Sequence, residues 1–513
     1  MSGVRAPERC HRLCDVNIAQ ILWNTADAVP DRIAQRDNDL RLTYAGLAGR
    51  AAAIRDALIE SSVHPGDRIG ILLPHGADAA AAFYGVAAAG AIATVLNWLY
   101  RPRQVEHVLD DADVTILLTT REWMARQARA LERSVRIIFV EDIPAVGSGG
   151  PVDSPGHAPV QICYTSGSTG GPKGVVVTHD NLAVGIRTVV GYLGISAADR
   201  IASVLPFSFV YGFNQLNCAI ATGATLDIVS TTLTPEIVRS LAANETTVLA
   251  CVPPLWMQLL RVADFSTPLP SLRVMTCAGG RLSPESVRAL RVAQPQARVF
   301  LMYGLTEVFR STYLPAEEVD AHPDSMGRAV PGSEVYVVRE DGSLCDDDEV
   351  GELVHSGPTV GLGYWRNPEA TARVFRPNPT GRSDEPFDRA VYSGDLVRCD
   401  SGGRLYYVGR RDRMIKTLGF RVSPDEITDV IYASKQVSEA AVTSEPDAQR
   451  GERVVAHVVL APGGSFEALR RWCGVELPRH MQPARWDVRE SLPRNASGKH
   501  DVLALRAEAR PTG

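Results

Sequence analysis

The sequence predicts an α/β protein with a large N-terminal domain, a small β subdomain and a small α+β C-terminal domain. Three observations lead to this fold class. The 513 residues exceed the roughly 250–300 that one hydrophobic core supports, so two or more domains are expected. Up to about residue 320, strand-like runs alternate with helical patterns, which indicates parallel-type sheets covered by helices. From Gly327 to Val360 the pattern becomes strand-rich, which indicates the β subdomain.

The alternation is clearest in the first 150 residues. The Ala-rich stretch Ala45–Ile59 predicts a helix, and Asp67–Pro74 is typical of a buried strand that ends at its proline. Short apolar runs at Thr115–Thr119 and Val135–Val140 predict two further strands. Helices between such strands are expected to connect parallel neighbours.

One uncharged run, Ala79–Tyr100, is long enough to span a membrane. Gly90 divides it into a helix-like half, Ala79–Ala89, and a strand-like half, Ala91–Leu96. Because the run consists mostly of Ala and Gly, a buried helix followed by a buried strand is the better interpretation. We therefore expect no membrane span.

Composition excludes other classes of protein. The apolar share of 45% and the charged share of 22% are those of an ordinary globular protein, and a net charge of −6 predicts no nucleic-acid partner. Nine cysteines form no CxxC pair, and Cys10 and Cys14 alone lack the four ligands of a zinc site. Reduced thiols and an N-terminus without an apolar signal segment predict a cytoplasmic protein.

The most informative stretch is the Gly-rich loop Thr165–Gly174, which lies between two apolar runs typical of strands. It contains four glycines, four hydroxyl residues and Lys173. Glycines let backbone N–H groups surround an anion, so the loop suits a polyphosphate. It is not a Walker A loop, because Lys173 is followed by Gly174 and not by Ser or Thr. The alternative, a flexible linker, is disfavoured by the flanking strands.

The loop is similar to the signature loop of the AMP-forming adenylate superfamily, which comprises acyl-CoA synthetases, adenylation domains of peptide synthetases and beetle luciferases. Four further family motifs follow in order: Tyr303–Glu307, Tyr392–Asp395, Gly409–Arg421 and Pro493–Lys499. The resemblance covers nearly the whole chain and is closest in pattern to acyl-CoA synthetases. It implies a large domain over residues 1–409, which binds nucleotide and acid, and a small mobile domain over residues 410–513.

The resemblance also assigns roles to individual residues. Thr306 is expected at the α-phosphate of ATP, and Glu307 at Mg²⁺. Lys499 is expected to swing in and bridge the carboxylate and the α-phosphate, which makes these three the predicted catalytic residues. For Glu307 and Lys499 the alternative is a solvated surface charge. The expected nucleotide-binding residues are Thr165, Ser166, Gly167, Ser168, Thr169, Lys173, Gly279, Gly280, Tyr303, Thr306, Asp395 and Arg410.

Two further positions match family sites of the second half-reaction. Asp412 matches the hinge about which the small domain rotates between an adenylating and a thioester-forming arrangement. Gly419 matches a site beside the thiol tunnel, where a side chain would fill the passage.

The acyl pocket is expected to include Phe207, Phe209 and Tyr211. Adenylation domains for α-amino acids place an Asp in this stretch to bind the ammonium group, but Leu205–Asn214 contains no acidic residue. We therefore expect an apolar carboxylic acid. Phe209 stands where many acyl-CoA enzymes have His, which makes the mouth of the site less polar.

The implied reaction is ATP-dependent formation of an acyl-adenylate, followed by acyl transfer to CoA or to the phosphopantetheine of a separate carrier protein. Three alternatives remain: an enzyme of one half-reaction, a nucleotide-binding sensor without chemistry, and an oxidase of the luciferase type. The joint presence of Lys499, Glu307 and Asp395 favours the ligase over the sensor.

Overall fold

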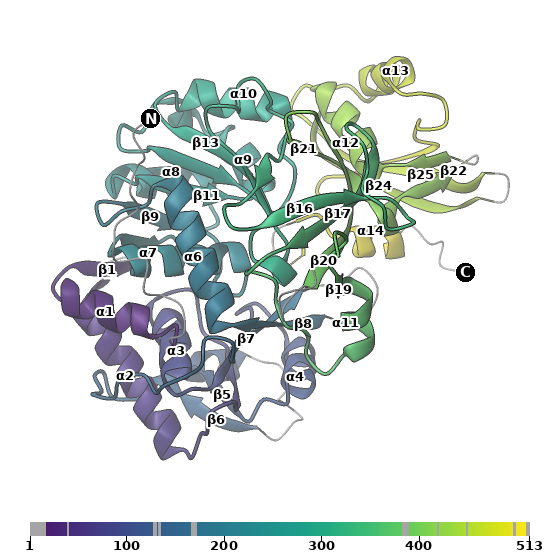
Figure 1. The fold of residues 1–513 in the computed structure, drawn as a ribbon. Coiled ribbons are helices and arrows are strands. Elements are labelled where there is room, and N and C mark those ends of the chain that lie inside the picture. Colours follow the sequence, from purple (N-terminus) through teal and green to yellow (C-terminus); the bar gives the residue numbers. More distant parts are fainter. Residues whose placement is uncertain are drawn as a thin grey trace, which may run out of the picture.

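The computed structural model describes residues 17–37, 40–126, 131, 135–165, 172–381, 389–417, 420–447, 450–495 and 499–508. Figure 1 shows a large body, built from the N-terminal four-fifths of the chain, with a smaller C-terminal domain beside it. This is the predicted α/β fold class.

Two mostly parallel sheets form the centre of the large body. The first has the strand order β18-β8-β7-β4-β3-β5-β6 among the described residues. Its strands are β3 (Arg68–Ile71), β4 (Ile92–Val95), β5 (Ile116–Thr119), β6 (Arg136–Phe139), β7 (Pro159–Thr165), β8 (Lys173–Thr178) and β18 (Gly363–Tyr364). β7 and β8 pair antiparallel, so the Gly-rich loop joins two strands of a hairpin.

The second sheet has the order β15-β14-β13-β12-β11-β9-β10-β1-β2 among the described residues. Its strands are β1 (Ile33–Asp37), β2 (Leu40–Thr43), β9 (Arg200–Ser203), β10 (Thr225–Ile228), β11 (Val248–Cys251), β12 (Val274–Cys277), β13 (Arg298–Tyr303), β14 (Thr312–Leu314) and β15 (Arg328–Ala329). Its central strands are parallel, and antiparallel strands close both edges.

Helices fill the space between these sheets and cover their outer faces (Figure 1). Alternate residues of a strand point to opposite faces, so Val248 and Ala250 of β11 join the central core while Leu249 and Cys251 join the outer one. The central helices are α1 (Gln20–Ala28), α2 (Tyr44–Glu60), α3 (Ala77–Ala88), α6 (His179–Leu193) and α7 (Val210–Thr222). The outer helices are α8 (Thr234–Ala243), α9 (Pro253–Leu259) and α10 (Pro284–Ala293) on one side, and α4 (Pro102–Asp111) and α5 (Arg121–Arg126) on the other.

The uncharged run Ala79–Tyr100 forms most of α3 and the strand β4, as the sequence predicts. No helix in the described part of the chain is long and apolar enough to cross a membrane. The seven cysteines that the structure describes are free thiols, whereas Cys10 and Cys14 lie outside the described residues.

The predicted β subdomain is a third sheet, in which β16 (Glu334–Val338), β17 (Val350–Ser356), β20 (Arg389–Cys399) and β19 (Phe375–Pro377) are neighbours and β21 (Leu405–Arg410) pairs with β20. The helix α11 (Pro368–Val374) precedes β19.

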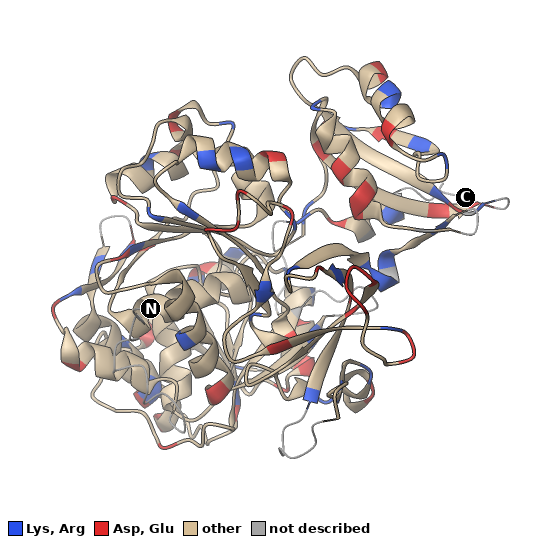
Figure 2. Ribbon diagram, turned by 45° about the horizontal axis from the view of Figure 1, so that its top comes forward, with Lys and Arg blue, Asp and Glu red and all other residues tan. Residues whose placement is uncertain are grey.

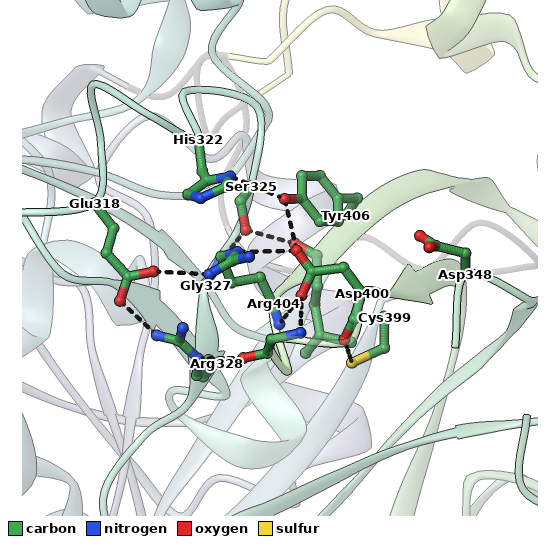
Figure 3. Close-up of polar contacts among 12 residues, drawn as sticks. Glu318, His322, Ser325, Gly327, Arg328, Asp348, Cys399, Asp400, Arg404 and Tyr406 are labelled. Carbon is green, nitrogen blue, oxygen red and sulfur yellow. Dashed lines mark hydrogen bonds and ion pairs between the residues drawn. The ribbon is translucent and has the colours of Figure 1, made fainter. Parts of the chain in front are cut away.

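A polar cluster anchors the turn between β20 and β21 to the large body (Figure 3). Asp400 accepts hydrogen bonds from Arg404 and Tyr406 at 2.9 and 3.0 Å. Arg404 also pairs with Glu318 at 3.5 Å, and Glu318 in turn binds Arg328. Gly327 is left-handed at φ +80°, and a methyl group there would overlap the carbonyl oxygen of Tyr313. The cluster thus fixes one end of a hairpin whose other end carries Asp395 and Arg410.

The C-terminal domain has its own core and a fourth sheet of order β23-β22-β25-β24, with β26 paired to β25. The short turn Arg411–Arg413 connects it to β21. Its elements are β22 (Ile415–Thr417), β23 (Phe420–Val422), α12 (Pro424–Ala433), β24 (Val437–Asp447), β25 (Gly451–Leu460), α13 (Phe466–Glu476), β26 (Arg485–Val488) and α14 (Val502–Glu508). Figure 2 shows basic and acidic residues intermixed over both domains.

Candidate active site

A cavity of about 1630 Å³ lies between the large body and the C-terminal domain. Both parts of the chain contribute to its wall. Gly279, Thr306 and Asp395 come from the large body, and Lys499 comes from the C-terminal domain. Residues far apart in the sequence therefore meet in one space that is large enough for a nucleotide and a second small molecule.

Lys173, near the end of the Gly-rich loop, is the first residue of β8 and lines this cavity. Its Nζ lies 5.4 Å from the ring centroid of Tyr364, which β18 places beside β8. The Tyr364 hydroxyl donates a hydrogen bond of 2.6 Å to Glu307 Oε1. One tyrosine thus links the loop lysine to the carboxylate predicted to hold Mg²⁺.

Thr306 and Glu307 lie in the turn that follows β13, at the carboxyl end of a central strand. Parallel sheets bind ligands at this edge because loops rather than strand side chains surround the opening there. Gly304 lets the chain turn closely, since a methyl group on it would lie 3.1 Å from the Phe309 carbonyl oxygen. The turn exposes both predicted side chains to the cavity.

Asp395 and Arg410 face each other across the β20–β21 ladder. The Arg410 guanidinium binds Asp395 Oδ1 at 3.0 Å, and the Tyr303 hydroxyl donates to Oδ2. Burial and the adjacent Asp395 raise the pKa of Tyr303 well above its ordinary value, so the phenol stays a donor. An ionised carboxylate has about four acceptor sites, which leaves Asp395 able to accept further hydrogen bonds from a ligand.

Lys499 enters the cavity beside Gly279. A methyl group on Gly279, which is left-handed at φ +83°, would lie 3.6 Å from the lysine Cε and 3.5 Å from the Phe209 ring. Asn495 holds the lysine backbone through bonds of 2.8 and 3.1 Å. Lys499, the glycine pair at 279–280 and the predicted acyl pocket are therefore neighbours.

The surroundings of Lys499 lower its pKa below the ordinary lysine value. Loss of hydration within the cavity is the largest cause, and the positive charges of Arg413 and Arg410 act in the same direction while Asp395 opposes them. Lys499 is nevertheless exposed to the solvent of the wide cavity. Its pKa is therefore lowered by partial loss of hydration and by neighbouring charges, and not by complete burial in the core.

The predicted acyl residues divide into two groups. Phe209 and Tyr211, at the start of α7, line the cavity. Phe207 does not line it; its ring packs edge-on against His75 with centroids 4.3 Å apart. The Tyr211 hydroxyl is bound to Thr276, and its ring lies 5.1 Å from the Arg310 guanidinium. Sequence reasoning missed Arg310, although it stands three positions after Glu307.

Several predicted positions cannot be placed. Ser166, Gly167, Ser168, Thr169 and Gly419 lie outside the described residues, as do the side chains of Thr165 and Asp412. The remaining predicted nucleotide residues, Lys173, Gly279, Gly280, Tyr303, Thr306, Asp395 and Arg410, all line the same cavity.

The fold and the cavity define a two-domain nucleotide-binding protein with a lysine supplied by the smaller domain. The chain belongs to the AMP-binding enzyme family, whose main domain matches residues 22–365 and whose C-terminal domain matches residues 426–499.

Solved structures of similar shape include two bacterial proteins that the chain covers almost completely. Bacillus subtilis o-succinylbenzoate CoA synthetase, bound to its acyl-adenylate, is 26% identical with a TM-score of 0.84; the similarity covers 95% of this chain and 97% of that one. ATP-bound MatB from Rhodopseudomonas palustris is 26% identical with a TM-score of 0.86, over 96% and 99%.

Similar curated proteins include δ-poly-L-ornithine synthetase of Acinetobacter baumannii, 30% identical over 96% of this chain. The chain spans only 36% of that protein, and 21% of the dimodular nonribosomal peptide synthase of Bacillus subtilis. L-proline–[L-prolyl-carrier protein] ligase of Pseudomonas fluorescens is 29% identical over 93% of this chain and 96% of its own length.

Proposed function

We propose that the chain activates a small carboxylic acid with ATP to an acyl-adenylate and then transfers the acyl group to a thiol. The observation that carries this proposal is the position of Lys499, which reaches from the C-terminal domain into the cavity beside Gly279 and Phe209. A protein that only sensed a nucleotide would not need a cation between the nucleotide and acid ends of its site.

In the adenylation step, a carboxylate oxygen attacks the α-phosphorus of ATP and pyrophosphate leaves. Negative charge builds up on the phosphate oxygens, so catalysis depends on cations and donors already in place. We assign Lys499 and Thr306 to the α-phosphate and the carboxylate, and Lys173 to the terminal phosphates. Asp395 and Arg410 would hold the ribose, and Tyr303 and the glycine pair at 279–280 would enclose the base.

Glu307 suits a Mg²⁺ ion bound with ATP. Magnesium is commonly held by one or two carboxylates together with substrate phosphates and waters. The hydrogen bond from Tyr364 holds the Glu307 carboxylate in place. When bound, Mg²⁺ would neutralise charge on the phosphates.

We further propose that the structure represents the adenylating arrangement of two domains divided near residue 409, with the hinge at Asp412. Arg281 of the large body forms an ion pair with Asp429 of α12, and Arg261 donates to the Ser438 carbonyl oxygen at 2.8 Å. These contacts hold the small domain where Lys499 faces the cavity. Thioester formation would require a rotation that withdraws the lysine and brings the loop containing Gly419 toward the site.

The thiol is proposed to be CoA, with a carrier-protein phosphopantetheine as the alternative. The names of the relatives include a CoA synthetase and a carrier-protein ligase, so they support a thiol acceptor without selecting one. Two of the names refer to the amino acids L-ornithine and L-proline, yet residues 205–214 of this chain offer no carboxylate for an ammonium group. We therefore propose a carboxylic acid without an α-amino group.

Acid-dependent exchange of pyrophosphate into ATP, measured across a panel of aliphatic, aromatic and α-amino acids, tests this function. Active acids are then incubated with CoA or with a phosphopantetheine-bearing carrier protein, and thioesters are identified by mass. We expect exchange with carboxylic acids, none with α-amino acids, and a CoA thioester. Binding of ATP without exchange for any acid would instead support the nucleotide sensor.

A further inference from the structure

Arg310 is a buried cation at the acyl end of the cavity. It follows the turn that carries Thr306 and Glu307, lines the cavity, and is only 3% exposed. Burial of a guanidinium costs free energy unless a carboxylate or equivalent acceptors accompany it. The surroundings of Arg310 therefore indicate what the site is built to receive.

Within the described part of the chain, no carboxylate lies within ion-pair distance of Arg310, and its buried Nε has no hydrogen-bond partner. The groups beside the guanidinium are two phenols: the Tyr192 side chain, and the Tyr211 ring, whose centroid is 5.1 Å from Cζ. Burial raises the pKa of Tyr192 above its ordinary value, so this phenol is neutral. Neutral phenols position the guanidinium, but they supply no negative charge to balance it.

A second, small cavity beside Arg310 is bordered by another polar side chain. A cavity of about 20 Å³ is lined by Tyr211, Met302 and Arg310, which line the large cavity as well. Gln215 borders this small cavity, and its Oε1 is buried without a hydrogen-bond partner among the described residues. A volume of this size accommodates one water or one polar group. A purely apolar acyl chain would leave Nε of Arg310 and Oε1 of Gln215 without a hydrogen-bond partner.

We propose that the acid activated at this site carries a second carboxylate, which Arg310 binds as its counter-ion. This inference rests on the proposed function and specifies its substrate class as dicarboxylic acids. Arg310 is four residues from Thr306, so their Cα atoms are at most about 14 Å apart, which restricts the acid to a short one. The remaining wall, with Phe209, Tyr211 and Met257, suits the apolar body of such an acid.

The test compares pyrophosphate exchange by the wild type and by Arg310→Met. The substrates are linear dicarboxylic acids from malonic to suberic acid and n-alkanoic acids of the same carbon number. The wild type should prefer a dicarboxylic acid. The kcat/KM of the variant for this dicarboxylic acid should be about 10- to 150-fold lower, which is the range for loss of a charged hydrogen bond. Its kcat/KM for the alkanoic acid should be higher than that of the wild type. Arg288→Met, which removes an exposed helical arginine outside the cavity, should change neither value.

Thermal unfolding gives a second measure that does not depend on turnover. The best dicarboxylic acid should raise the Tm of the wild type and of Arg288→Met but not that of Arg310→Met. An unpaired buried charge costs free energy, and Met fills a similar volume without that cost, so the variant should fold. Arg310→Lys, which keeps the charge but loses the two-pronged geometry, should retain part of the preference.

Two results would overturn the inference: a wild-type preference for alkanoic acids, or an equal loss for both series in Arg310→Met. The second result would place Arg310 at the reacting carboxylate or in the fold. Failure of the proposed function looks different, because ATP would then raise the Tm while no acid in either series supported exchange.

Discussion

Replacement of Lys499 should affect one of the two proposed half-reactions and not the other. Replacing it by Ala should lower acyl-adenylate formation by about 10²–10³, the usual loss for one group that stabilises developing charge. Thioester formation from supplied acyl-adenylate should stay near the wild-type rate, because the lysine would be withdrawn in that arrangement. Single-turnover assays of each half measure this. An equal fall in both halves would mean that the lysine is structural.

The charges around Lys499 predict a pH effect. In the proposed mechanism the lysine acts as a cation, so adenylation should fall as pH rises through its pKa, which lies below the ordinary value of 10.5. Arg413 is the largest contributor to that shift among the neighbouring charges. Arg413→Gln removes the repulsion and should move the alkaline limb of kcat/KM to higher pH. Arg450→Gln, in the turn between β24 and β25, is the control and should leave the limb in place.

At the scale of elements, an ion pair between Arg281 and Asp429 joins the large body to α12, and its side chains are each about one-third exposed. Partly exposed pairs contribute little, so Arg281→Ala should slow adenylation by only about 1.5- to 5-fold. Thioester formation from supplied adenylate should not slow, because the pair would be broken in that arrangement.

Arg288→Ala on the exposed face of α10 is the matched control for Arg281→Ala, since it also removes an arginine from a surface ion pair. Rapid-quench experiments measure the rates of both half-reactions. Slowing of thioester formation by Arg281→Ala as large as that of adenylation would contradict the proposed arrangement.

For the whole molecule, the property to test is the proposed rotation of the small domain near Asp412. This residue lies in the turn Arg411–Arg413, whose 3₁₀ geometry fits the fixed φ of proline. Asp412→Pro should therefore preserve pyrophosphate exchange. If the thioester-forming arrangement needs another φ at residue 412, the proline destabilises that arrangement by about 3 kcal/mol. Thioester formation by Asp412→Pro should then fall by about 10²-fold. Asp412→Ala, which keeps the backbone free, should behave as the wild type; equal thioester yields from both variants would remove the hinge from this position.

The sequence by itself determined the fold class and the order of the motifs, and it predicted residues that prove to line one cavity. Lys173, Thr306 and Asp395 stand in short segments whose glycines and polar side chains are chemically distinctive before any folding is known. Strands and helices such as β4 and α3 were predictable because their apolar patterns are local.

Only the tertiary structure decided which side chains share the cavity. Phe207 and Phe209 are two positions apart, yet one packs on His75 and the other lines the cavity. Lys499 meets Gly279 across two domains, and the buried Arg310 lies beside Tyr192 of α6 and Tyr211 of α7. Burial and the presence of a counter-ion depend on segments distant in the chain, and a local sequence pattern contains no information about them.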